Sequence, residues 1–488
     1  MERWQIITLV IAVYLAVTLM IGLFSGRRAS KSVAGYVAGD RDFGLLVMYF
    51  VLGASVFSAF AFLGGPGWAY SRGAAAFYIL CYGVIGIAPY YFIGPKAAEM
   101  GRRHGYVTQA QLICGRFPSR GLSVMIAVLT VAAFIPYITL QMRGAGIVIE
   151  AVTEGNVPLW AGAAIAYGIV TIYVLFSGVA AVGWTNTFQG IFMLTIAWSL
   201  GLYLPISLYG GVGDMFSRIL AERPELLTMP GLTASGEPWS WGGYSSAIIV
   251  SGVGLMMWPH LFMKAFTART DDTLRKTVVL FPTFQLFLIP VFLIGFAGVL
   301  YPEKPDAPDF ILPFMILNAD LPAIVVGLFC AGALSASMST GDSLMHAAAS
   351  VTVEDGVRPY KELSDLARRR LIQGLVLVVG TIAYLFAVTE GVSLVVLLLT
   401  AYGIICQLAP PIVAALYWPR ATTAGVIAGF VAGSGTAAFF FLSGYFGNEL
   451  HPYDLHEGFL GLAVHIPVLI IVSLLTQAQP ASHREQFA

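Results

Sequence analysis

The chain has 488 residues, of which 58% are hydrophobic and only 11% are charged, with 26 basic and 26 acidic side chains. Soluble domains carry about 25% charged residues, so the composition excludes an ordinary soluble protein and indicates a membrane protein in a lipid bilayer. A net charge of zero gives no sign of nucleic-acid binding. The four cysteines are widely spaced and form no CxxC pair, so we expect neither disulfides nor a zinc site.

Long apolar runs follow one another along the whole chain. A helix needs about 20 apolar residues to cross a bilayer core of roughly 30 Å. The sequence therefore predicts an all-α membrane protein of about 13 transmembrane helices, near 4–24, 43–71, 74–95, 121–149, 158–176, 184–208, 245–263, 277–300, 321–352, 371–388, 392–416, 423–444 and 458–476.

The charged loops predict the orientation. Threading the spans with the N-terminus outside places most Lys and Arg on the cytoplasmic face, in "GRRASK", "GRRHG", "KAFTARTDDTLRK" and "RPYKELSDLARRR". This is the pattern of the positive-inside rule. The segment 209–244 then becomes an extracellular loop with short helices, and the C-terminus lies in the cytoplasm. We expect the final polar stretch "TQAQPASHREQFA" to be a disordered tail.

Glycine and proline interrupt two of the spans. The second contains "GASVFSAFAFLGGPGW", Gly53 to Trp68, and the seventh contains "SGVGLMMWPH", Ser251 to His260. Kinked helices packed through glycine are one interpretation. Without the first span, however, the two segments open two successive sets of five spans, which is where an inverted-repeat transporter places its broken helices.

The ninth span contains one acid, Asp342, in the stretch "LSASMSTGDSLMHAAASVTVED". Helical spacing aligns Ser339, Thr340 and Ser343 in one stripe, with Asp342 at its edge. Hydroxyls of this kind also serve close helix packing by bonding their own backbone. An acid at mid-membrane costs at least about 2.5 kcal/mol, so it indicates function. Hydroxyls and carbonyls freed by a broken helix are suitable ligands for a small hard cation.

Three stretches together resemble the sodium:solute symporter family, whose members share the leucine-transporter (LeuT) fold. They are "SASMSTGDSLMHAAASVTVED", "FSGVAAVGWTNTFQG" and "GASVFSAFAFLGGPG". The resemblance implies an N-terminal extra helix in 1–42, a first repeat of five helices in 43–208 and an extracellular loop in 209–244. A second, inverted repeat would occupy 245–416, and two peripheral helices with a short tail would occupy 417–488. It also implies that the monomer is the functional unit.

The resemblance also implies the ligands of a sodium site: the backbone oxygens of Ala54, Phe57 and Ala336 and the hydroxyls of Ser339 and Thr340. Some members bind a second sodium through an acid of the family signature. Here Asn186 replaces that acid, which weakens the expectation. Asp342 and Ser343 are the candidates to compensate for it, and an electrostatic or proton-sensitive role for Asp342 is the alternative.

Candidate substrate contacts lie near the two interrupted spans. Arg143 is the only base that we place well within a span. It either binds a substrate carboxylate in bidentate fashion or reaches the outer surface near Glu150 or Glu154. Gln141 cannot share its helix face. The remaining candidates are Ser58, Phe60, Trp258 and His260, of which His260 is also readable as a polar residue at a cytoplasmic helix end.

These features predict a symporter of the cell membrane that couples sodium entry to uptake of a small organic solute. Arg143 favours a small monocarboxylate, and a proline or other amino-acid symporter of the same family is the alternative. From a different class, a membrane sensor that binds its solute without moving it also remains open. A sequence without a P-loop or a metal-ligand cluster within the spans gives no support to an ATP-driven pump or an enzyme.

Overall fold

The computed structural model describes residues 1–25, 32–389, 401–445 and 452–487. These residues form helices joined by short turns, with two isolated β-bridges and no β-strand among them. In this part of the chain nine helices are long and apolar enough to cross a membrane, or up to ten if one bent pair counts as a span. The expectation of an all-α membrane protein is confirmed. The expected span 392–416 lies partly outside the described residues.

The helices of the first half of the chain precede the expected extracellular loop or begin within it. They are α1 (Arg3–Ser25), α2 (Val33–Ala38), α3 (Leu45–Val56), the π-helical η3 (Phe60–Gly64), α4 (Gly65–Arg72), α5 (Tyr78–Ile87), α6 (Tyr90–His104), α7 (Gln109–Arg116), α8 (Arg120–Val152), α9 (Leu159–Tyr209) and α10 (Val212–Glu222).

The helices of the second half begin with a second interrupted element. They are α11 (Trp241–Leu255), α12 (Pro259–Phe262), α13 (Asp271–Gln285), α14 (Leu288–Val299), α15 (Ile311–Asn318), α16 (Ala323–Val351), the π-helical η8 (Thr352–Val357), α17 (Asp365–Val388), α19 (Ala409–Tyr417), α20 (Thr423–Tyr445), α21 (Glu457–Leu475) and α22 (Ala481–Arg484). Short 3-10 turns are η2 (Gly39–Arg41), η4 (Gly73–Phe77), η5 (Pro224–Leu227), η6 (Met263–Thr267), η7 (Pro308–Phe310), η9 (Cys406–Leu408), η10 (Pro452–Asp454) and η11 (Glu485–Phe487).

The longest element, α9, contains two of the expected spans, 158–176 and 184–208. A straight helix of its 51 residues would be about 77 Å long, more than twice the thickness of a bilayer core. The chain instead bends at Gly178, whose φ of 57° lies in the left-handed region. A Cβ at this position would lie 2.6 Å from the carbonyl oxygen of Tyr36, so both the conformation and the space require glycine.

Both interrupted spans are broken. After Val56 the chain leaves the helix at Phe57 (φ −90°, ψ 91°) and resumes helical structure in η3 and α4. The second break separates α11 from α12 and η6, whose axes differ by 44°. Helix ends leave carbonyl groups without intrahelical partners, and at membrane depth such groups are tolerated only where they face protein or a cavity. The two breaks are therefore the candidate positions of a binding site.

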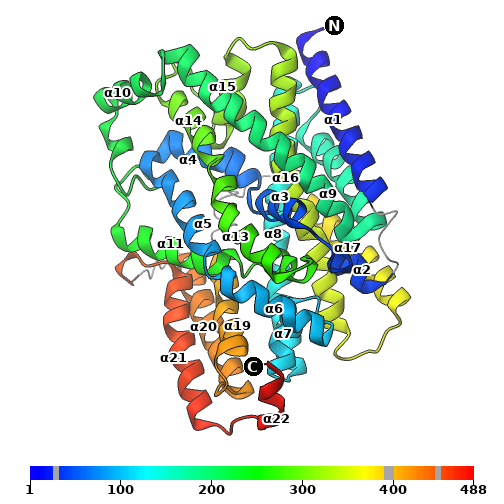
Figure 1. Ribbon diagram of the computed structural model, residues 1–488. Coiled ribbons are helices and arrows are strands. Elements are labelled where there is room, and N and C mark those ends of the chain that lie inside the picture. Colours follow the sequence, from blue (N-terminus) through cyan, green and yellow to red (C-terminus); the bar gives the residue numbers. More distant parts are fainter. Residues whose placement is uncertain (26–31, 390–400, 446–451, 488) are drawn as a thin grey trace.

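The helix α16 lies in the middle of the bundle and packs against α1, α3, α8, α9 and α17 (Figure 1). Nearly every residue from Val326 to Val351 is buried. Alanine, serine and glycine dominate this segment, and small side chains let neighbouring helices approach closely. The stripe of hydroxyls predicted from the sequence therefore lies in the interior of the molecule.

The basic loops contact one another at one end of the bundle. Arg102 forms an ion pair of 2.7 Å with Asp271, and Arg41 donates to the carbonyl oxygen of Tyr106 at 2.9 Å. The C-terminal segment joins this end, where the ring of Phe487 stacks on His104 with centroids 5.3 Å apart. The expectation of a disordered tail is wrong for its last part, because α22 and η11 dock on these loops.

Candidate functional site

The break after α3 faces the hydroxyl stripe of α16. Ser339 Oγ donates to the carbonyl oxygen of Ala54 at 2.8 Å and lies 3.3 Å from the carbonyl oxygen of Ala336. Thr340 Oγ1 lies 3.4 Å from the carbonyl oxygen of Ala54 and 3.2 Å from that of Ser55. Four of the five residues named as sodium ligands are thus brought together. Phe57, the fifth, stands at the break itself, with its ring stacked on Phe284 of α13.

The spacing of these oxygens suits a small hard cation. Ca²⁺, whose size is close to that of Na⁺, binds oxygen at about 2.3–2.6 Å, so two ligands at right angles lie roughly 3.3–3.7 Å apart. The separations of Thr340 from the Ala54 and Ser55 oxygens are 3.4 and 3.2 Å, and that of Ser339 from the Ala336 oxygen is 3.3 Å. The 2.8 Å contact between Ser339 Oγ and the Ala54 carbonyl oxygen is shorter than this range, so it would lengthen around a bound ion.

The residues named for a second cation have separate partners. Asn186 Nδ2 donates to Ser55 Oγ and to the carbonyl oxygen of Ser339, both at 3.1 Å. The Asp342 carboxylate instead accepts from two residues of α9, at 2.9 Å from Tyr173 and 3.3 Å from Thr185. Asn186 therefore supplies an N–H donor where the family signature has an acid. The Asp342 carboxylate is held by Tyr173 and Thr185, two other residues of α9.

A buried lysine lies beside this cluster. Lys264 is 4% exposed and its Nζ donates to Ser343 Oγ at 3.4 Å, while Ser343 Oγ lies 2.9 Å from Ser55 Oγ. The prediction that Arg143 is the only base within a span is wrong. Lys264 directly follows the predicted span 245–263. Because helical structure continues through α12 and η6 to Thr267, the lysine is carried into the interior.

Two candidate substrate residues meet at the break of α3. Gln141 of α8 is fully buried and accepts from the Ala59 N–H at 2.8 Å, and Ser58 Oγ accepts from the Phe60 N–H at 3.1 Å. Phe60 is buried in the π-helical turn. Nε2 of Gln141 has no hydrogen-bond partner among the described residues, so it is a donor available to a ligand.

Arg143 points elsewhere. Its guanidinium is partly exposed and donates to the carbonyl oxygen of Thr389 at 3.1 Å. Glu150, one of the expected partners, instead accepts from the Leu159 N–H at 3.1 Å. Of the two residues that cannot share a helix face, Gln141 is the one that reaches the break.

The second break carries an aromatic cluster. The indole of Trp258 stacks on Phe134, with centroids 5.9 Å apart and planes at 8°, and contacts Tyr137 at 5.0 Å and Tyr402 at 5.5 Å. His260 is 2% exposed, so it is not a polar helix end at the surface. Within the described part of the chain, neither Trp258 Nε1 nor either ring nitrogen of His260 has a hydrogen-bond partner of good geometry.

The α8 residues connect the two breaks. Tyr137 and Gln141 are four positions apart and share a helix face. Tyr137 contacts the rings of Trp258 and His260, while Gln141 binds the backbone of Ala59. Tyr137, Phe134 and Tyr402 could not be singled out from the sequence, because aromatic residues in apolar spans give no signal that separates a pocket from ordinary packing.

Comparisons with known proteins show the family to which the chain belongs. The sequence profile described as the sodium:solute symporter family matches residues 36–433. The uncharacterized symporter YhjB of Bacillus subtilis is 29% identical, over 96% of this chain and 98% of that protein. A monocarboxylate transport permease protein of Rhizobium johnstonii is 26% identical, over 90% of each.

The fold has close counterparts among solved structures. The structure of a Na⁺-coupled sialic acid symporter in a substrate-bound outward-open state superposes with a TM-score of 0.82, at 16% identity, over 97% of this chain and 98% of that one. At this identity the likeness concerns the fold, which is the LeuT fold predicted from the sequence. The family profile covers well over half of the chain. The chain therefore belongs to the sodium:solute symporter family, a family of Na⁺-coupled membrane transporters and not of enzymes.

Proposed function

We propose that this protein imports a small monocarboxylate together with Na⁺ by alternating access. The observation that carries the proposal is the convergence of the Ser339 and Thr340 hydroxyls on the carbonyl oxygens of Ala54 and Ser55 at the break of α3. A cation in this position joins α3 to α16 across the two halves of the bundle. Its binding therefore favours one arrangement of the two repeats, 43–208 and 245–416, over the other.

The substrate would lie between the two breaks. Gln141 Nε2, Trp258 Nε1 and the His260 ring offer N–H groups without good partners among the described residues, and a carboxylate supplies oxygen acceptors for such donors. The ring of Phe134 and the other aromatic residues around Trp258 suit a short apolar tail. The printed name of the Rhizobium johnstonii relative, a monocarboxylate transport permease protein, supports the same substrate class.

We further propose that one Na⁺ accompanies each substrate. The second cation position known in some members would lie near Ser343, where the Lys264 ammonium already donates to the hydroxyl. A fixed ammonium there repels a second cation and supplies a positive charge to the neighbourhood of Asp342. One Na⁺ carried with one monocarboxylate anion moves no net charge, so the Na⁺ concentration gradient, and not the membrane potential, would drive each cycle.

The membrane orientation belongs to the same proposal. The basic loops around Arg102, Arg358 and Arg368 would face the cytoplasm, with the N-terminus outside and the C-terminus inside. Modification by an impermeant thiol reagent tests this: a single cysteine introduced at Glu2 should react from outside intact cells. If the cysteine reacts only after the cells are permeabilised, the N-terminus lies in the cytoplasm and the proposed orientation is wrong.

Flux measurement tests the main proposal. Proteoliposomes should accumulate labelled short monocarboxylates when an inward Na⁺ gradient is imposed, and K⁺ in place of Na⁺ should abolish accumulation. Saturable accumulation of proline instead would select the amino-acid alternative. Na⁺-dependent binding in a thermal-shift assay without any flux would select the sensor.

A matched pair of variants tests the substrate site. Gln141→Leu removes both the acceptor for the Ala59 N–H and the unpartnered donor, so the KM for the solute should rise about tenfold. Arg143→Lys should leave the KM nearly unchanged, because among the described residues the Arg143 guanidinium donates to the Thr389 carbonyl oxygen and to no group at the break of α3. If the KM rises for Arg143→Lys and stays unchanged for Gln141→Leu, the substrate carboxylate binds at Arg143.

A further inference from the structure

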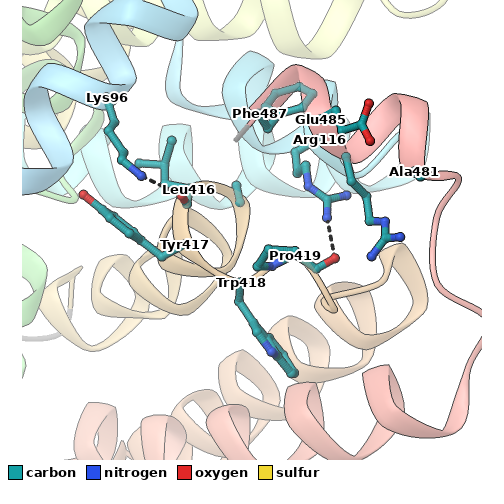
Figure 2. A pocket seen from close by; sticks show the side chains of 11 residues that line it. Lys96, Arg116, Leu416, Tyr417, Trp418, Pro419, Ala481, Glu485 and Phe487 are labelled. Carbon is teal, nitrogen blue, oxygen red and sulfur yellow. Dashed lines mark hydrogen bonds between the residues drawn. The ribbon is translucent and has the colours of Figure 1, made fainter.

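A basic cavity lies where the docked C-terminal segment meets the helical bundle (Figure 2). Its volume is about 390 Å³. The segment α22–η11 forms one wall, the end of α7 forms the second, and the loop after α19 forms the third. The lining of the cavity includes Lys96, Arg116, Tyr417, Trp418, Arg484 and Glu485.

Three cations line this cavity, and two of them are incompletely paired. Arg116 is 1% exposed; its Nη2 donates to the carbonyl oxygen of Pro419 at 3.0 Å, while its Nη1 has no partner in the described ranges. Arg484 Nε likewise lacks a partner there. Lys96 lies over the ring of Tyr417, with Nζ 4.2 Å from the centroid, and its contact with the Leu416 carbonyl oxygen is long at 3.4 Å.

The Arg116 guanidinium points toward the Pro419 carbonyl oxygen, whereas the Glu485 carboxylate is directed away from it (Figure 2). Arg484 lines the same cavity. Two like charges side by side repel each other. Burial, and then the charge of Arg484, lower the pKa of Arg116. An anion between the two groups would remove this repulsion and supply acceptors for the unpartnered N–H groups.

A phosphate group fits these donors best. Arg binds phosphate oxygens in bidentate fashion, and a cavity of this size holds a phosphate with part of the molecule that carries it. Tyr417 and Trp418 are aromatic residues of the type enriched at membrane–water interfaces. We propose that this cavity binds the phosphate group of a phospholipid headgroup or of a soluble phosphate ester.

The docked tail is part of the site. His483 Nε2 lies 3.1 Å from the Arg116 carbonyl oxygen, and Phe487 is buried against the His104 ring. Arg484 reaches the cavity only because these contacts hold α22 in place. Anion binding and tail docking are therefore linked, and each stabilises the other.

Thermal unfolding of the purified full-length protein tests the site without any transport measurement, so its failure leaves the proposed function untouched. The apparent Tm is followed against inorganic phosphate in detergent at constant ionic strength. In a parallel arm it is followed against the mole fraction of phosphatidic acid in phosphatidylcholine nanodiscs. A saturable rise in the lipid arm alone identifies a headgroup, a rise in the phosphate arm alone identifies a soluble ester, and either supports the proposal.

Arg484→Gln should raise the midpoint of the saturable response about tenfold, because it removes one charged hydrogen-bonding partner. Arg370→Gln, on an exposed arginine outside the cavity, should respond as the natural protein does. A chain ending at Gln479 should lose the response altogether. The proposal is overturned if neither arm raises the Tm, or if Arg484→Gln and the shortened chain respond like the natural protein.

Discussion

Replacing Ser339 with alanine is the sharpest test of the cation site. The substitution removes one hydroxyl that lies 2.8 Å from the Ala54 carbonyl oxygen and 3.3 Å from that of Ala336. A hydrogen bond to a charged group contributes about 1.5–3 kcal/mol, and a lost oxygen ligand should cost a similar amount. Every 1.4 kcal/mol is tenfold, so the Na⁺ concentration for half-maximal uptake should rise about 10- to 150-fold.

The assay is the initial rate of solute uptake into proteoliposomes at a series of Na⁺ concentrations, with choline keeping the ionic strength constant. Ser350→Ala is the matched control. Ser350 is equally buried on α16, but its hydroxyl donates to the His346 carbonyl oxygen of its own helix at 2.7 Å. That variant should change the half-maximal Na⁺ concentration by less than about twofold, because such local bonds contribute little.

Thr340 provides a second test of the cation site. Thr340→Ser keeps the hydroxyl that lies 3.4 and 3.2 Å from the two carbonyl oxygens of α3, so its Na⁺ dependence should stay close to that of the natural protein. Thr340→Ala should behave like Ser339→Ala. An unchanged Na⁺ dependence in both alanine variants, with normal folding, would refute the site.

Further substitutions test the charges and the packing around the cation site. Lys264→Met removes a buried cation that interacts electrostatically with Asp342, so the Tm of the purified protein should fall. The double variant Lys264→Met/Asp342→Asn should recover part of the lost Tm. If the Tm losses of the two single variants simply add in the double variant, the two charges are independent. Gly53→Ala places a Cβ 2.5 Å from the Phe284 ring and should destabilise by about 1–3 kcal/mol. Gly168→Ala, which meets no atom within 4 Å, should be neutral or stabilising, and equal Tm values for the two variants would contradict the packing argument.

Much of this protein's architecture could be predicted from local patterns in the sequence. Runs of apolar residues predicted the spans, because helix length and bilayer thickness are matched. Glycine and proline located the two breaks, since both residues weaken a helix from within the chain itself. Helical spacing put Ser339 and Thr340 on one stripe, and the family resemblance supplied the carbonyl groups that the stripe faces.

Only the tertiary structure decided which polar groups meet. Lys264 and Ser343 are 79 positions apart, and Arg116 and His483 are 367 apart. No short-range pattern reports such contacts. The chain also looked loop-like at Lys264, where a broken helix carries the lysine inward.

The tail looked disordered because its composition is polar, yet its few aromatic and basic residues find partners on distant loops. The sequence by itself thus determined which segments are helical and where they break, because those properties depend on neighbouring residues. The packing of α3, α8, α9, α12 and α16 determined which side chains share a site, because helix packing alone sets the distances between segments remote in sequence.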